Sequence, residues 1–198
     1  MEYLKKLKYN SPVILTFTLI CLVVLVLGSI TDGYTTRKFF SVYRSSIANP
    51  LSYIRVFTHI LGHSNFQHFF NNFLIILIVG PMLEEKYGSK ILLILIVITA
   101  FITGVVQIII SDKALLGASG IAFMLIILTS FTNVEDGKIP LTMVLIAIMY
   151  FGKEIYNGIK FYYDNVSQIT HIIGGICGII IGIVISKIYK RRTYYDKT

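Results

Sequence analysis

The sequence predicts an all-α membrane protein, a bundle of six transmembrane helices with a first extracellular loop that is partly embedded in the membrane. Hydrophobic residues make up 55% of the 198 residues and charged residues only 14%, against roughly 25% charged residues in soluble domains. The mean hydropathy is +0.75. Apolar runs recur along the chain at about the 20 residues that a helix needs to cross a bilayer. In lipid, runs of this kind are expected to be helical.

The first span is expected at residues 12–30. Asn10 or Ser11 can cap its start, and Pro12 suits the first helical position because no amide hydrogen is needed there. The basic segment before it resembles the start of a signal peptide, but the apolar run is longer than a signal peptide needs and no convincing cleavage site follows. We therefore expect a retained helix after a cytoplasmic N-terminal segment, 1–11.

Residues 31–58 form the longest stretch between spans, and they mix cations with aromatic residues. Arg37, Lys38, Arg44 and Arg55 are interleaved with tyrosine and phenylalanine side chains. Because such rings lie at headgroup level and long cations reach water, we expect this loop to lie on or partly in the outer leaflet. A turn is predicted within it at Pro50.

Five further spans are expected at residues 65–83, 90–110, 114–131, 139–151 and 167–188. The second span is expected to turn at Pro81, and the fifth begins near Pro140. A basic cytoplasmic tail, 189–198, follows the last span. With the N-terminus inside, cytoplasmic segments hold 11 of the 18 Lys and Arg residues and outer segments hold 7. Both termini are therefore expected in the cytoplasm of a multi-pass cell-membrane protein.

The net charge of +8 does not indicate a nucleic-acid partner, because the Lys and Arg residues are strung between apolar runs and do not form one basic face. Anionic lipid and the orientation rule account for them, so the lipid bilayer is the expected partner. Cys21 and Cys177 lie inside apolar runs, where they act as small hydrophobic residues. They indicate neither a disulfide nor a redox compartment.

Spans two, four and six are expected to run from outside to inside, and each carries its unusual polar residues near its start. These residues are His68 and Asn72, then Ser119, then His171. At 1.5 Å per residue, Ser119 and His171 are expected at similar depth, roughly 5–10 Å below the starts of their helices. Polar side chains inside a membrane are costly unless they face the bundle interior or a wet cavity, so this layer predicts a functional site.

The residue types in this layer permit acyl-transfer chemistry. Ser119 can act as a nucleophile if His171 removes its proton. His68 and Asn72, four residues apart on one helix face, can donate hydrogen bonds to an oxyanion together with the Ser119 backbone N–H. The acid nearest to His171 in the sequence, Asp164, is seven residues earlier in a loop. We therefore predict a Ser/His dyad and not a triad.

Glycines surround these groups. Gly117 and Gly120 flank Ser119, and they leave room for a substrate or, taken alone, for close packing of helices. A stripe at four-residue spacing would let span six approach span four closely; it consists of Gly174, Gly178 and Gly182. The polar side chains also have a structural reading, in which the two histidines and Asn72 join neighbouring helices by hydrogen bonds.

A metal site is a further possibility to weigh, because His59, His63 and His68 lie close together in the sequence. No cysteine joins them, and the nearest acids, Glu84 and Glu85, are expected at the opposite membrane face. We therefore expect neither a metal site nor a cofactor.

Four segments carry a family pattern: Arg55-Val56-Phe57-Thr58-His59 with His63, His68-Phe69-Phe70-Asn71-Asn72, Gly117-Ala118-Ser119-Gly120, and His171-Ile172-Ile173-Gly174-Gly175-Ile176-Cys177-Gly178. In this order the chain resembles the rhomboid intramembrane serine proteases from about residue 53 to residue 188. The resemblance implies that Ser119 is the nucleophile and His171 the base, with His68, Asn72 and the Ser119 amide as the oxyanion hole. It also implies a gate, made by span five and the loop before span six, through which a substrate helix reaches the site.

Two positions depart from the pattern of that family. Ile54 precedes Arg55 where the family usually has tryptophan, so the first loop is expected to be anchored less firmly. Phe123 stands four residues after Ser119, where a tyrosine often packs on the catalytic imidazole. Phenylalanine keeps the stacking surface and loses only the hydroxyl, so activity is expected to survive.

Residues 12–188 are thus expected to form a six-helix rhomboid-like catalytic domain. The predicted function is an intramembrane serine endopeptidase that cuts transmembrane segments of other membrane proteins near the outer face. One alternative is an inactive rhomboid-like binder of client helices, which the presence of Ser119 and His171 argues against. The other is a small transporter, for which charged residues in mid-span are expected; spans three to five carry none away from their ends.

Overall fold

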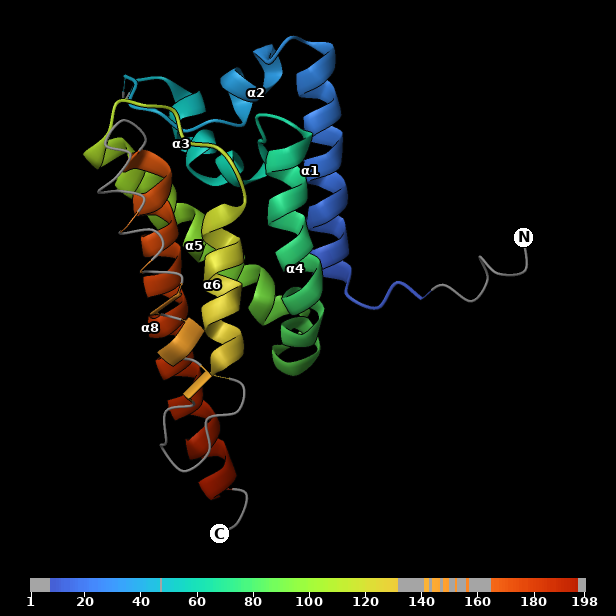
Figure 1. The fold of residues 1–198 in the computed structure, drawn as a ribbon, viewed down its shortest axis with the longest axis vertical. Helices are drawn as coiled ribbons and strands as arrows, with labels where there is room; N and C mark the ends of the chain where they lie inside the picture. Colours follow the sequence, from blue (N-terminus) through green and yellow to red (C-terminus); the bar gives the residue numbers. More distant parts are fainter. Residues whose placement is uncertain are drawn as a thin grey trace, which may run out of the picture.

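The computed structural model describes residues 8–46, 48–131 and 165–195, with isolated positions between 141 and 156. Within these residues the long helices stand side by side, and two short helices, α2 (Tyr34–Phe39) and α3 (Pro50–Thr58), cover one end of the bundle (Figure 1). The long helices are α1 (Pro12–Ile30), α4 (Phe66–Tyr87), α5 (Ser89–Ile110), α6 (Ser119–Ser130) and α8 (Asn165–Tyr195). A short 3₁₀ helix, His59–Leu61, joins α3 to α4.

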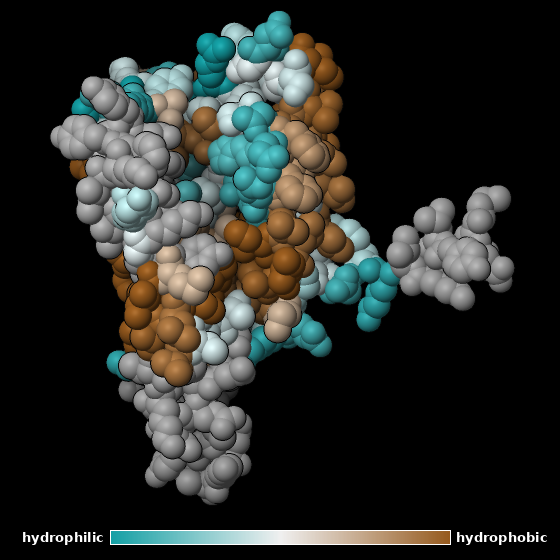
Figure 2. All heavy atoms as spheres, viewed as in Figure 1, coloured by the Kyte–Doolittle hydropathy of each residue, from teal (hydrophilic) through white to brown (hydrophobic). Residues whose placement is uncertain are grey.

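Among the described residues, four helices are long and apolar enough to cross a membrane: α1, α4, α5 and the Ile169–Lys187 part of α8. On the face shown in Figure 2, hydrophobic residues cover much of the bundle between its ends, and hydrophilic residues gather at the end that carries α2 and α3, with a further hydrophilic patch over the start of α4. The molecule is therefore a multi-pass membrane protein. About half of the predicted fifth span, 139–151, lies outside the described residues, and the described positions there are helical.

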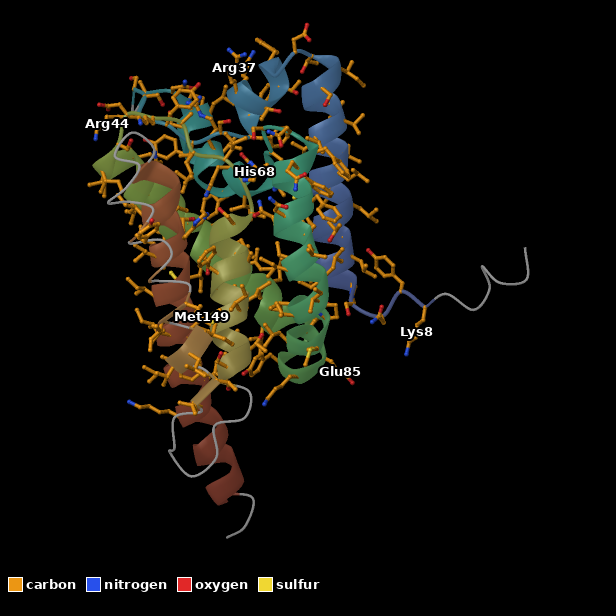
Figure 3. The ribbon with its side chains drawn as sticks, viewed as in Figure 1. Lys8, Arg37, Arg44, His68, Glu85 and Met149 are labelled. Carbon is orange, nitrogen blue, oxygen red and sulfur yellow. The ribbon has the colours of Figure 1, made fainter. Side chains whose placement is uncertain are left out.

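The helix directions agree with the prediction. α4, α6 and α8 all run from the end that carries α2 and α3 toward the opposite end (Figure 1). α1 begins at that opposite end, so the first turn of α1 and the last turn of α8 share one side of the bundle. Arg37 and Arg44 mark the end at α2 and α3, and Lys8 and Glu85 mark the other (Figure 3).

The central helix is α6, and it is shorter than the predicted span 114–131. Every residue from Gly120 to Leu128 is buried, as expected of a helix that is hydrophobic on all sides. Its 12 residues cover only about 18 Å, less than the thickness of a bilayer core. The predicted helix was wrong at residues 114–118. These residues are apolar but not helical, because their backbone groups form hydrogen bonds with partners far away in the sequence.

α4 continues past Pro81 to Tyr87, where the prediction placed a turn. This extension carries Glu84, which is 4% exposed and lies beside the start of α1. Its carboxylate accepts hydrogen bonds from the backbone N–H groups of Val13 (2.9 Å) and Ile14 (3.0 Å), and from the hydroxyl of Ser89 (2.7 Å). The cap predicted from Asn10 or Ser11 is thus replaced, since Ser11 makes no side-chain cap and Glu84 satisfies these amides.

Replacing Glu84 by alanine is expected to destabilise the fold by roughly 3 kcal/mol, because it leaves buried donors of α1 without acceptors. Glu85, the next residue along α4, is exposed and provides the matched control. Thermal unfolding in detergent should show a clear drop for Glu84→Ala and almost none for Glu85→Ala. Equal stability of the two variants would contradict this role.

The first loop is more ordered than a single turn at Pro50 would suggest. Pro50 is the first residue of α3, and the side chain of Asn49 caps this helix by accepting a hydrogen bond from the Leu51 N–H (3.0 Å). Ahead of α3, Val42 pairs with Leu115 through two backbone hydrogen bonds of 2.9 and 2.8 Å. The loop is therefore tied to the segment that leads into α6.

Candidate active site

The close contact of α6 with α8 brings Ser119 and His171 into one region. A Cβ added at Gly174 would lie 2.9 Å from the Cα and carbonyl carbon of Gly120 and would clash with its carbonyl oxygen. One at Gly120 would meet Thr170 at 3.5 Å. Only glycines permit such an approach of two helix backbones, and it brings the first turn of α6, which begins at Ser119, close to the turn of α8 that carries His171.

The imidazole of His171 lies flat against Phe123. The two ring centroids are 4.4 Å apart and the ring planes differ by 8°. Since Phe123 is one helical turn after Ser119, this contact holds the imidazole beside the first turn of α6. The side chain at the position where the family pattern often has tyrosine therefore supplies a stacking surface here.

The segment before Ser119 is held by residues of the first loop. The backbone N–H of Gly117 donates to the carbonyl of His59 (2.9 Å). Gly117 has φ +120°, and a Cβ there would lie 2.6 Å from His68 Nε2 and 3.6 Å from Asn72 Nδ2. Gly117 is therefore required both by its backbone conformation and by its two polar neighbours on α4.

His63 connects this segment to α4, a role that the sequence did not reveal. Its Nε2 accepts hydrogen bonds from the Asn72 side-chain amide (3.1 Å) and from the Ala118 backbone N–H (3.4 Å). Its Nδ1 lies 3.3 Å from the Leu61 carbonyl, which can only accept, so Nδ1 carries the proton. One neutral imidazole thus orients Asn72 and fixes the residue that precedes Ser119.

His68 lies between the first turns of α4 and α6 (Figure 3). Its Nδ1 is 3.2 Å from the hydroxyl of Ser64, and its backbone N–H donates to the side chain of Asn65, which caps α4 (2.8 Å). With Nε2 next to Gly117, the ring presents this nitrogen toward the start of α6. Ser64 therefore contacts the far side of the ring from the candidate site.

The position of Ser119 within α6 differs from the prediction. Ser119 is the first residue of α6 and not several residues below its start, because residues 111–118 enter the bundle as an irregular segment. Ala118, at the cap position, makes no side-chain cap. The first amides of α6 thus have no side-chain cap from the cap residue and no partner within the helix.

Comparison with known proteins identifies the family. A family model of the Rhomboid domain matches residues 50–188. The chain belongs to the rhomboid family. The rhomboid protease GlpG of Haemophilus influenzae is 30% identical over 148 residues, which cover 69% of this chain and 71% of that protein. The resemblance predicted from the four segments is thereby confirmed, and this rhomboid belongs to a family of intramembrane serine proteases.

Some of the predicted features of this rhomboid lie outside the described residues. These are Asp164, most of the loop before α8 and about half of the fifth span. The predicted gate, made by span five and that loop, therefore falls largely outside the described part of the chain. Within the described part of the chain, no three His, Cys, Asp or Glu side chains form a cluster that could hold a metal ion. Cys21 and Cys177 are both buried free thiols.

Two loop histidines of this rhomboid are buried as neutral rings. Burial lowers the pKa of His59 from 6.5 to about 4, against a smaller opposing effect of its hydrogen bond to the Val56 carbonyl (3.0 Å). Burial, followed by the nearby His68, lowers the pKa of His63 to about 4. Both rings are at most 2% exposed.

The fold is therefore expected to lose stability as the pH falls from 6.5 to about 4. In that window the unfolded chain binds protons at these histidines and the folded chain does not; above pH 6.5 neither state does. The shift at His59 corresponds to at most about 3 kcal/mol at pH 4. His59→Gln should flatten the pH dependence of thermal unfolding in detergent, and an unchanged slope would argue against this origin.

Proposed function

We propose that this rhomboid is an active serine endopeptidase that hydrolyses peptide bonds in or near transmembrane segments of other membrane proteins. The observation that carries the proposal is the stacking of the His171 imidazole on Phe123 at 4.4 Å, one helical turn after Ser119, which is the first residue of α6. We infer that a nucleophile, a base and the backbone donors of the first turn of α6 meet there, inside a membrane bundle. The catalytic domain would comprise residues 12–188, with both termini in the cytoplasm and the site near the outer face.

In the proposed reaction, Ser119 Oγ attacks the carbonyl carbon of the scissile bond while His171 takes the hydroxyl proton. The tetrahedral intermediate then collapses, the C–N bond breaks, and His171 returns the proton to the leaving amine. Water attacks the resulting ester with His171 again as the base, which frees Ser119.

The oxyanion of the intermediate needs donors aimed at it. We assign this role to the Ser119 backbone N–H, His68 Nε2 and Asn72 Nδ2. The assignment is supported by the position of both side chains next to Gly117, which is two residues before Ser119. Asn72 is 6% exposed, and its bond to His63 leaves its second amide hydrogen available.

The rival proposal is an inactive binder of client helices. A fluorophosphonate probe distinguishes the two, because it reacts with an activated serine and spares an ordinary one. Labelling of the parent at Ser119, lost in Ser119→Ala, is the expected result. Ser130→Ala, which changes a buried serine at the other end of the same helix, should label like the parent. Failure of the folded parent to label would favour the inactive binder.

Ser64 is expected to tune the reaction through His68. If its hydroxyl donates to Nδ1, the proton of His68 stays on Nε2, where an oxyanion needs it. Loss of this one hydrogen bond in Ser64→Ala should lower kcat about fivefold and leave KM nearly unchanged. Ser64→Thr keeps the hydroxyl and should restore kcat. A rise in KM without a change in kcat would contradict this role.

A further inference from the structure

A groove between α3 and α5 takes no part in the candidate active site. It has a volume of about 320 Å³, and its walls are mainly aromatic and aliphatic, with Phe57, Phe101 and Ile108 among them. Phe57 and Phe101 stack at 5.6 Å between ring centroids and are 43% and 48% exposed. In a membrane-spanning bundle, exposed rings of this kind face lipid.

One end of the groove is polar, and a guanidinium lies behind it. Tyr43, Ser45 and Ser52 line this end. Arg55 Nη2 donates to the hydroxyls of Ser45 (3.0 Å) and Ser52 (3.3 Å), and the guanidinium lies 4.1 Å from the centroid of the Tyr43 ring. The hydroxyls at the polar end are therefore polarised by a cation directly behind them.

Arg55 has no anionic partner among the described residues. It is 2% exposed, its Nε makes no hydrogen bond there, and no described Asp or Glu forms an ion pair with it. Arg44, at the same end, is neutralised by Asp112 at 2.8 Å. A buried cation without a counter-ion is costly. The groove end thus carries a net charge of about +1, which matches one phosphodiester.

The dimensions of the groove suit one extended chain. Phe101 and Ile108, which both line it, are seven residues apart on α5, which corresponds to about 10 Å. The polar end lies toward the end of α5 and the apolar part toward its middle, which is the orientation of a phospholipid in its leaflet.

We propose that this groove binds one anionic phospholipid, with an acyl chain along Phe57 and Phe101 and the phosphate at Ser45, Ser52 and Arg55. The two serine hydroxyls bond each other at 2.7 Å, so one of them is left to donate to a phosphate oxygen, and the phosphate charge balances that of the guanidinium behind them. The glycerol end of the lipid lies at the interface beside Tyr53, which is 62% exposed and lines the groove.

The chain contains no tryptophan, so the fluorescence of a single introduced tryptophan reports on lipid bound in the groove. Phe101→Trp places the reporter in the groove wall, and Val23→Trp places one on the exposed side of α1, at a similar distance from the same end of the bundle. Both proteins are reconstituted with brominated phosphatidylglycerol or brominated phosphatidylcholine as a minor component. At Phe101→Trp, phosphatidylglycerol should be enriched about fivefold over phosphatidylcholine, as judged from quenching. At Val23→Trp, the two lipids should quench about equally.

Substitution of Arg55 tests whether its positive charge causes the preference for an anionic lipid. Arg55→Gln should remove the preference for phosphatidylglycerol at the Phe101→Trp reporter, whereas Arg37→Gln, which changes an exposed arginine at the same end, should keep it. Equal quenching by both lipids at Phe101→Trp, or an equal effect of the two arginine variants, would overturn the proposal. So would a reporter shielded from both lipids, which would indicate a second protein copy. The reporter comparison decides the matter even if Arg55→Gln does not fold.

Discussion

Cleavage of a reporter transmembrane segment is expected to fall by at least about 10⁴-fold in Ser119→Ala, since no other group in the site can form the acyl intermediate. His171→Ala should lose a similar factor, because the serine hydroxyl is a weak nucleophile without its base. The two residues act on one proton, so the double variant should be no worse than either single one. The measurement is initial rates with purified protein reconstituted in lipid, below and above KM.

A graded series makes this prediction stricter. Asn72→Ala removes one proposed oxyanion donor and should cost about 10²-fold in kcat, less than loss of the nucleophile. Ser130→Ala removes a buried hydroxyl that bonds the Ile126 carbonyl within α6 and should leave the rate unchanged. If Ser119→Ala and His171→Ala cut as fast as the parent, the proposed dyad is wrong. If Asn72→Ala costs as much as Ser119→Ala, its role is more than donation to the oxyanion.

The sequence predicted those features that depend on local composition. The bounds of α1 and α5 came within about one residue of the predicted spans, because an apolar run of the right length can only be a helix in lipid. The glycine stripe likewise predicted the close approach of α8 to α6, since small residues at four-residue spacing lie on one helix face. Neither feature needs knowledge of a distant partner.

Features that depend on distant partners were missed. The residues before Ser119 are as apolar as a helix, and only the bonds from Leu115, Gly117 and Ala118 to the first loop and His63 keep them irregular. From the sequence, Glu84 was similarly expected in a polar turn after Pro81. In the structure it caps a helix that begins about 70 residues earlier. Hydropathy depends only on the type of each residue, so it does not indicate which distant backbone amide a side chain will bond.

Gly174→Ala is the second variant with a large expected effect, although it adds only one methyl group. The new Cβ would meet the backbone of Gly120, including its carbonyl oxygen, and backbone atoms cannot rotate out of the way as a side chain can. α6 and α8 must then separate. The cost of overpacking, about 1–3 kcal/mol, is only partly offset by the gain of about 1 kcal/mol from replacing a helical glycine.

The larger consequence of Gly174→Ala is for the reaction, because Gly120 directly follows Ser119 and Gly174 is about one helical turn after His171. A shift of about 1 Å between nucleophile and base can cost about 10²-fold in rate, so we expect kcat to fall by that factor. Gly182→Ala is the matched control: its Cβ would meet the ring of Phe131, two helical turns further from the site. It should affect thermal stability and leave kcat close to that of the parent. A Gly174→Ala protein with the parent's kcat would show that the closeness of the two backbones does not set the distance between Ser119 and His171.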